Sequence, residues 1–127
     1  MKINIDTFVN DYLTTAAWVT CDSGENQEFT EKAKEDAKAD CLKFIEAVKK
    51  EFGEEKAEQL LTIAGNDLGY IAPHDFFLTR NSHGAGFWDS PKIYGKENSI
   101  KLTEICKNMR AVDCYHIKGK KSKLCFD

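Results

Sequence analysis

The chain has 127 residues, of which 42% are hydrophobic and 31% are charged, and its formal net charge is -3. This length and composition predict a single globular domain over residues 1–127, and they argue against a disordered chain. The isoelectric point near 5.6 indicates no overall attraction for nucleic acids or anionic membranes, so a nucleic-acid partner is disfavoured.

The cysteine pattern indicates free thiols in or near the core. The cysteines are Cys21, Cys41, Cys106, Cys114 and Cys125. Their number is odd, no two have the C-x-x-C spacing, and no histidine pair accompanies them at zinc-finger spacing. The first residues turn polar before an apolar run develops, and no apolar run has transmembrane length. We therefore expect a cytoplasmic protein with no membrane segment.

A first helix is predicted from residue 5 onward, with Asp6 as its cap. Apolar residues recur at helical spacing over 5–17, and Trp18 either extends this stripe into the core or closes its end. Residues 21–26 have the composition of a turn.

Two more helices are predicted before the middle of the chain. Thr30 opens the stronger one, which has acids near its start, lysines near its end and Gly53 as its stop. Its other face is a solvated charged surface. A shorter helix follows over 54–64, and Gly65 ends it.

The middle of the chain is predicted to form a β-hairpin. Pro73 ends a connector and favours extended backbone before it. Residues 76–79 and 85–88 have strand character, and turn-forming residues stand between them. Gly84 and Gly86 are expected to take positive φ angles or to allow a close backbone approach.

The last third is predicted as a loop over 90–95, a helix capped by Asn98 or Ser99, and two strands at 112–117 and 122–126. The resulting fold class is α+β, with three N-terminal helices, a β-hairpin, a helix and a second β-hairpin. The helices would pack on a small, mainly antiparallel sheet.

The turn between the last two strands is basic. It contains Lys118, Lys120 and Lys121, and Lys123 follows. Lysines commonly protect an exposed sheet edge, which is one interpretation. The alternative is a patch that contacts phosphates with salt-sensitive affinity.

The stretch 74–89 reads HDFFLTRNSHGAGFWD. It resembles the signature H-D-F-[WF]-L-T-R-N-x-H-G-A-G-F-W-D of short bacteriophage, prophage and plasmid proteins, and segments 17–19, 102–104 and 112–115 are similar to other parts of that family. The resemblance implies a mobile-element origin, hence the cytoplasm of a host bacterium, but no activity and no catalytic residues. Family members have an acidic GDDG turn where this chain has lysines at 118–121, so no role tied to that turn is implied.

The candidate binding residues of this stretch are Asp75, Thr79, Arg80, Asn81, His83, Trp88 and Asp89. In a functional interpretation, Arg80 clamps an anion, His83 carries a proton, and Asp75 or Asp89 fixes its tautomer. In a structural interpretation, Arg80 pairs with Asp75 or Asp89 and pins the hairpin, and His83 hydrogen-bonds a carbonyl. Phe76, Leu78, Phe87 and Trp88 then fill the core against the helices.

The known enzyme motifs do not fit. The HGAG run at 83–86 is similar to an esterase oxyanion turn, but the chain has no G-x-S-x-G elbow and no G-K-[ST] phosphate loop. A metal site from His74, His83 and Asp89 lacks helical or finger spacing. No cofactor and no metal are therefore predicted, the catalytic residues are unknown, and whether the protein is an enzyme stays open.

Two function classes are compatible with these residues. The first is a non-enzymatic accessory protein that binds a host protein or defence component through the 74–89 hairpin, because Trp and Arg dominate binding hot spots. The alternative is a small enzyme or ligand-binding protein that acts on a nucleotide or other anion through Arg80, His83 and Asp89. Nucleic-acid binding through the C-terminal lysines is a third, less favoured class.

Overall fold

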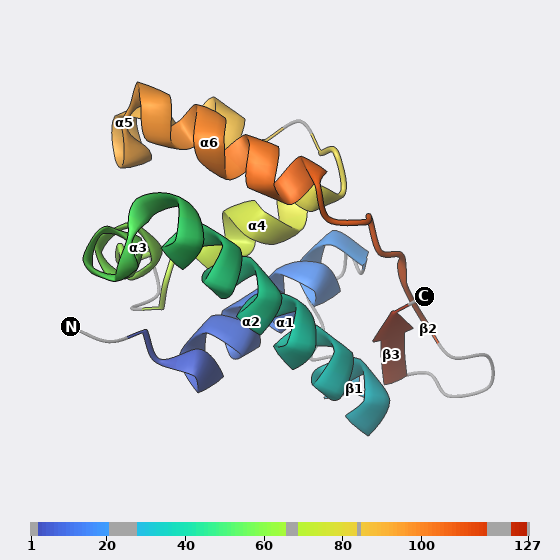
Figure 1. The fold of residues 1–127 in the computed structure, drawn as a ribbon. Coiled ribbons are helices and arrows are strands. Elements are labelled where there is room, and N and C mark those ends of the chain that lie inside the picture. The colour runs from blue at the N-terminus through green and yellow to red at the C-terminus, as the bar shows by residue number, and fades with distance from the viewer. Residues whose placement is uncertain (1–2, 21–27, 66–68, 84, 117–122, 127) are drawn as a thin grey trace.

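The computed structural model describes residues 3–20, 28–65, 69–83, 85–116 and 123–126. In chain order the elements are α1 (Ile5–Thr20), β1 (Glu28–Phe29), α2 (Glu31–Phe52), α3 (Glu54–Leu61), α4 (Ala72–Arg80), the 3-10 turn η1 (Phe87–Asp89), α5 (Pro91–Tyr94), α6 (Lys96–Lys107), β2 (Cys114–His116) and β3 (Lys123–Phe126) (Figure 1). The α+β class is confirmed, but the predicted order of elements is wrong in the middle of the chain. The two turns predicted at 21–26 and 118–121 lie outside the described residues.

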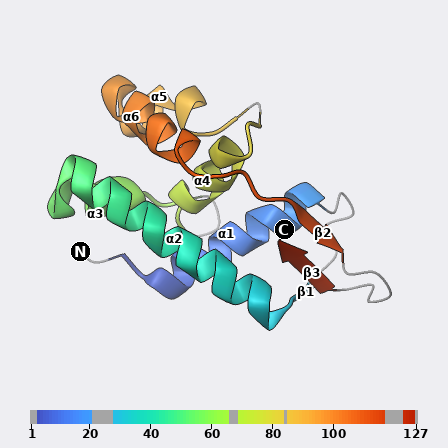
Figure 2. The same cartoon turned by 45° about the vertical axis from the view of Figure 1, so that its right-hand side comes forward.

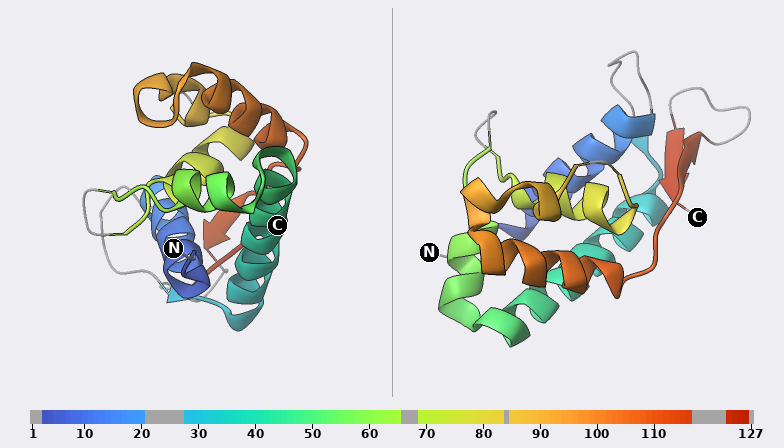
Figure 3. Two further views of the ribbon diagram at one scale, coloured as in Figure 1. Left: turned by 60° about the vertical axis from the view of Figure 1, so that its left-hand side comes forward. Right: turned by 90° about the horizontal axis from the view of Figure 1, so that it is seen from above.

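The helices form three levels. Helices α1 and α2 cross at the base, α4 lies on them, and α6 covers α4, with α5 beside α6 (Figures 1 and 2). The strands lie at the end of the molecule where α1 ends and α2 begins (Figure 3). This arrangement places α4 between other helices, and its surroundings determine what its polar side chains can do.

The first two helices are close to their predicted extents, whereas α3 ends at Leu61 and is followed by Thr62, so its predicted end at 64 and the Gly65 stop are wrong. Thr30 caps α2, because its hydroxyl accepts the N–H of Ala33 at 3.1 Å. Gly53 has a φ of 86° and stands both after α2 and before α3, so the predicted glycine stop is confirmed. Helix α1 begins one residue before Asp6, and the cap is Asn4, whose side chain accepts the N–H of Thr7 at 3.0 Å.

One cluster of buried side chains extends from α1 to β3. At its centre the rings of Phe44 and Phe76 stack with centroids 4.2 Å apart. Cys41 and Cys106 are buried on their helices as expected, and burial raises the pKa of both thiols. Trp18 is not part of this core, since it is 66% exposed.

The sheet is mixed, not mainly antiparallel. Its strand order is β1-β3-β2, with β3 parallel to β1 and antiparallel to β2. The pairing of the two C-terminal strands is therefore confirmed over the described residues. Strand β1 was not predicted, because two residues are too short to show an alternating pattern. Its Phe29 ring stacks on Phe126 of β3, with centroids 5.5 Å apart.

The predicted β-hairpin at 76–79 and 85–88 is wrong. Residues 72–80 form α4, and 87–89 form η1. Pro73 stands in the first turn of α4, where a helix tolerates proline because the missing N–H has no helical partner there. The helix was missed because nearly all of its residues are buried, so the sequence has no alternating polar face from which a helical period could be recognised.

The predicted loop and cap after η1 are also wrong. Pro91–Tyr94 is a short helix, and α6 begins directly after Gly95. Asn98 and Ser99 lie inside α6 and bind backwards to this junction: Asn98 Nδ2 donates to the Tyr94 carbonyl at 2.8 Å, and Ser99 Oγ donates to the Ser90 carbonyl at 3.2 Å.

None of the helices in the described part of the chain combines the length and the apolar content that crossing a bilayer requires.

We expect Thr30→Ala to lower the free energy of unfolding by about 1 kcal/mol, because it removes the acceptor that caps α2. Urea unfolding followed by circular dichroism measures this change. Thr14→Ala is the matched control: its exposed hydroxyl donates to the Asn10 carbonyl within α1 at 2.9 Å, and we expect a change of about 0.5 kcal/mol or less. Equal effects of the two substitutions would contradict the capping role.

Candidate functional site

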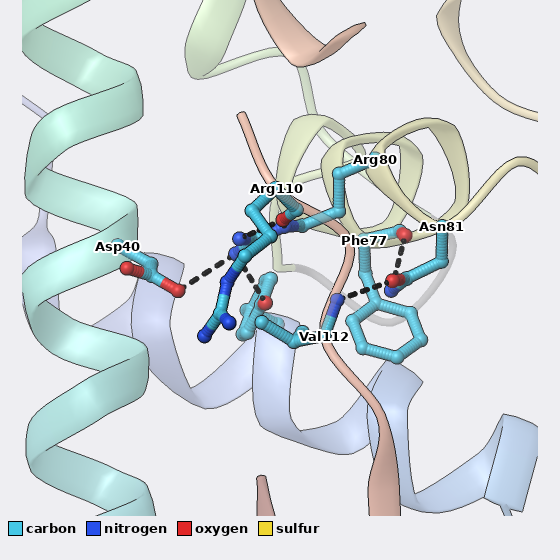
Figure 4. A network of polar contacts seen from close by, with 7 residues as sticks. Asp40, Phe77, Arg80, Asn81, Arg110 and Val112 are labelled. Atoms are coloured by element: carbon cyan, nitrogen blue, oxygen red, sulfur yellow. Dashed lines mark hydrogen bonds and ion pairs between the residues drawn. The ribbon is translucent and has the colours of Figure 1, made fainter. Parts of the chain in front are cut away.

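Arg80 joins four segments of the chain at the end of α4. Its Nη1 donates to Asp40 Oδ2 on α2 at 2.8 Å and to the Tyr12 hydroxyl on α1 at 3.1 Å. Its Nε donates to the carbonyl of Arg110 at 3.0 Å, and Nη2 donates to the same carbonyl. Figure 4 shows the guanidinium reaching from α4 toward α2, beside the segment that leads to β2.

The charge of Arg80 is held inside the molecule, where the residue is 6% exposed. Burial alone would lower its pKa, but the neighbouring Tyr12 and Asp40 raise the pKa of the guanidinium above its usual value. For the Tyr12 hydroxyl, burial has the opposite effect: it raises the pKa, so this side chain stays neutral. The guanidinium carbon also lies 5.3 Å from the centroid of the Phe76 ring. Arg80 is therefore a buried cation that links α4 to α1, to α2 and to the backbone at Arg110.

This arrangement corrects both predictions for Arg80. Its donors face Asp40, Tyr12 and a backbone carbonyl, so they are not arranged as an external anion clamp. The predicted partners Asp75 and Asp89 are not its ion-pair partner. Because 72–80 is helical, Asp75 and Arg80 stand at i and i+5 and do not share a face.

Asp75 connects α4 to α5. It is 5% exposed, and its Oδ2 accepts the hydroxyl of Tyr94 at 2.7 Å. Burial raises the pKa of the Asp75 carboxyl, and the Tyr94 hydrogen bond partly opposes that rise. Burial, with the nearby Asp75 charge, also raises the pKa of Tyr94. Asp75 is thus turned inward and does not reach His83 to fix its tautomer.

Thr79 connects α4 to η1. Its hydroxyl oxygen accepts the N–H of Phe87 at 2.9 Å. Gly86 has a φ of 143°, and a Cβ on it would lie 2.2 Å from Thr79 Oγ1. The predicted close approach at Gly86 is confirmed, whereas Gly84 lies outside the described residues. Only a glycine fits beside the threonine here.

Asn81 connects the end of α4 to the segment before β2. Its Nδ2 donates to the Phe77 carbonyl at 3.0 Å, and its Oδ1 accepts the N–H of Val112 at 2.8 Å (Figure 4). With Arg80, it holds two adjacent points of the 110–112 segment against α4. Its amide is therefore used on both sides by the protein itself.

Three candidate residues instead lie on the surface. His83 and Asp89 are exposed, and Trp88 is 53% exposed, so the expectation that Trp88 fills the core is wrong. The His83 ring stacks on Phe77, with centroids 6.3 Å apart. Trp88 borders an open hollow of about 630 Å³, the Trp88 groove. The groove is lined by Trp88, Asp89, Ser90, Pro91, Lys92 and Ile93.

The structure thus divides the seven candidates. Asp75, Thr79, Arg80 and Asn81 hydrogen-bond to other parts of the protein, and Arg80 and Asn81 share the 110–112 segment. His83, Trp88 and Asp89 are exposed. The metal alternative is not assembled either. Among the described residues no three His, Cys, Asp or Glu side chains gather as metal ligands, and Nδ1 of His74 lies 3.1 Å from the Thr15 hydroxyl.

Sequence reasoning missed the hydrogen-bond partners of these residues, above all Tyr12 and Asp40, which bind Arg80, and Tyr94, which binds Asp75. Asp40 offered a weak signal, because it is an acid at the border of the apolar face formed by Ala37, Cys41 and Phe44. A charge at such a border is positioned to pair with a buried cation. Tyr12 and Tyr94 offered none, since an apolar stripe looks the same with Phe or Tyr.

Comparison with known protein families, with curated proteins and with solved structures returns no significant match. The resemblance of residues 74–89 to mobile-element proteins therefore stays a prediction.

We expect Arg80→Ala to lower the free energy of unfolding by about 3 kcal/mol, because it leaves buried polar groups without their cation. Urea denaturation measures the loss. Arg110→Ala is the matched control, since it removes an exposed side chain and keeps the carbonyl that Arg80 binds, so we expect about 0.5 kcal/mol or less. Similar losses in both variants would show that Arg80 is not the link described.

The raised pKa of Asp75 predicts a pH-dependent stability. The folded state holds this proton more tightly than the unfolded state, whose carboxyl has the ordinary value of 3.8. The contribution of Asp75 is therefore full below that value, and it is lost as pH rises through the higher folded pKa.

Urea unfolding between pH 3.5 and pH 8 tests this, and Asp75→Asn should flatten that part of the profile. Tyr94→Phe should steepen it, because it removes the hydroxyl that stabilises the carboxylate. Parallel profiles for the wild type and both variants would contradict the assignment to Asp75.

Proposed function

We propose that this protein is a phage or mobile-element accessory protein that binds a host protein or defence component through the Trp88 groove. The observation that carries the proposal is the contrast between two adjacent aromatic residues. Phe87 is 0% exposed and Trp88 is 53% exposed, within one short turn. The proposed contact residues are Trp88 and Asp89, with His83 exposed on the preceding loop.

The turn holds Trp88 in place before any partner arrives. Thr79 binds the Phe87 N–H, and Ser90 Oγ donates to the Gly86 carbonyl at 2.9 Å. The Phe87 ring packs against Tyr94, with centroids 5.0 Å apart. A side chain displayed on a turn fixed at both ends loses little conformational entropy on binding, and this raises affinity.

The chemistry of the groove suits a protein partner. Trp88 and Ile93 are large apolar side chains that are 53% and 40% exposed, and Asp89 and Lys92 stand beside them. An exposed aromatic anchor with polar neighbours is the usual make-up of a binding hot spot. The resemblance of 74–89 to mobile-element proteins supports a bacterial host as the source of that partner.

We expect Trp88→Ala to weaken partner binding at least about 30-fold, which corresponds to a hot-spot loss of about 2 kcal/mol. Affinity capture from host lysate with quantitative mass spectrometry identifies the partner, and titration with the purified partner gives the affinities. Trp18→Ala is the matched control, because Trp18 is the same residue type, is 66% exposed and stands on α1. The proposal fails if no protein is captured specifically, or if the two variants bind equally well.

The alternative, an enzyme or binder of nucleotides or other anions through Arg80, His83 and Asp89, is less well supported. Its anion contact, Arg80, is engaged inside the protein by Asp40 and Tyr12. His83 and Asp89 alone supply no second cation for a phosphate. Thermal denaturation with and without ATP separates the two proposals, and a shift in melting temperature abolished by His83→Ala would favour the alternative.

A further inference from the structure

A second hollow lies between α1 and the segment that leads into α4. It has a volume of about 310 Å³. Four of its lining residues determine what it can bind: Asp11 and Thr15 from α1, Tyr70, and His74 from α4. None of these four belongs to the Trp88 groove, so a ligand bound here would be independent of the proposed function. We name it the Asp11 pocket.

The wall opposite α1 is held by hydrogen bonds. Oδ2 of Asp11 accepts the N–H of Tyr70 at 2.8 Å, and the Tyr70 hydroxyl accepts the N–H of Asn4 at 3.0 Å. Gly69 lies so close that a Cβ on it would stand 2.3 Å from Asp11 Oδ2. The Asp11 carboxylate is therefore positioned in the absence of any ligand.

The Thr15 hydroxyl lies between the Asp11 carbonyl, at 3.0 Å, and Nδ1 of His74, at 3.1 Å. The carbonyl can only accept a hydrogen bond. A hydroxyl that donates to it therefore accepts from Nδ1, and this arrangement satisfies all three groups. In the neutral ring Nε2 then carries a lone pair, so His74, which lines the pocket, supplies one acceptor.

The charges of the lining select the ligand. Asp11 is an anion, His74 is an acceptor through Nε2, and no Lys or Arg belongs to the described lining. An anionic ligand would meet the Asp11 carboxylate with no cation to balance it, whereas a protonated amine would meet its opposite charge.

We propose that the Asp11 pocket binds a small organic cation that carries a hydroxyl group. The ammonium group pairs with the Asp11 carboxylate, and the hydroxyl donates to Nε2 of His74. Thr15 is a positioning residue, because it acts only through the His74 tautomer.

The test uses three linear probes that differ in charge: 4-amino-1-butanol, 1,4-butanediol and 4-hydroxybutyrate. Each is titrated into ¹⁵N-labelled protein while amide chemical shifts are recorded. We expect saturable shifts at Thr15, Gly69 and Tyr70 with the amino alcohol, binding at least about tenfold weaker with the diol, and no saturable shift with the acid. No saturation with the amino alcohol, or equal binding of the diol, overturns the proposal.

Asp11→Asn tests the charge, since asparagine keeps an oxygen that accepts the Tyr70 N–H. We expect it to weaken amino-alcohol binding at least about tenfold, whereas Asp113→Asn, at a position outside the pocket lining, leaves it unchanged. Unchanged binding to Asp11→Asn overturns the proposal.

A second variant keeps the test decisive if Asp11→Asn does not fold. Wild-type protein should prefer 4-amino-1-butanol to butylamine, which lacks the hydroxyl, and His74→Phe should abolish that preference while still binding both amines. A preference that survives His74→Phe overturns the role given to Nε2.

Discussion

A positive charge buried among helices needs partners on every side, and the guanidinium of Arg80 sets this requirement for the whole fold. It is met by Asp40 from α2, Tyr12 from α1 and the backbone at Arg110. Each partner comes from a different part of the chain, so the three must arrive together or the charge is left unpaired. The bond network therefore specifies how α1, α2 and α4 meet and where the segment toward β2 passes.

The other polar residues of α4 extend the same principle. Asp75 binds α5, Thr79 binds η1, and Asn81 binds the chain at Val112. His74 lines the Asp11 pocket, whereas the other polar side chains of α4 face its neighbours and decide what those neighbours display. The outward position of Trp88 follows from this, because the Thr79 bond fixes Phe87 inside and leaves the next residue outside.

Sequence reasoning succeeded where one side of an element faces water. The stripe of α2, its Thr30 cap and Gly53 could be recognised because polar and apolar residues alternate with the helical period. It failed for α4, where burial on all sides removes that contrast and leaves aromatic residues that resemble a strand. The prediction of the partner of Arg80 failed for a related reason. Asp40 lies 40 positions from Arg80 in the chain, and no local sequence pattern identifies a partner at that separation. Nor does the sequence show that Phe87 is buried and Trp88 exposed, because both are large aromatic residues and the turn alone decides which one faces inward.

The mixed sheet has a consequence for how the protein is made. The backbone N–H of Thr30, the residue that caps α2, donates to the carbonyl of Leu124 at 3.0 Å, and Glu28 binds Lys123 across 95 positions. During synthesis the first two helices therefore leave the ribosome long before β3 exists to cover Phe29. Closure of so long a loop is slow, and the nascent chain carries an uncovered aromatic edge until translation has passed β3.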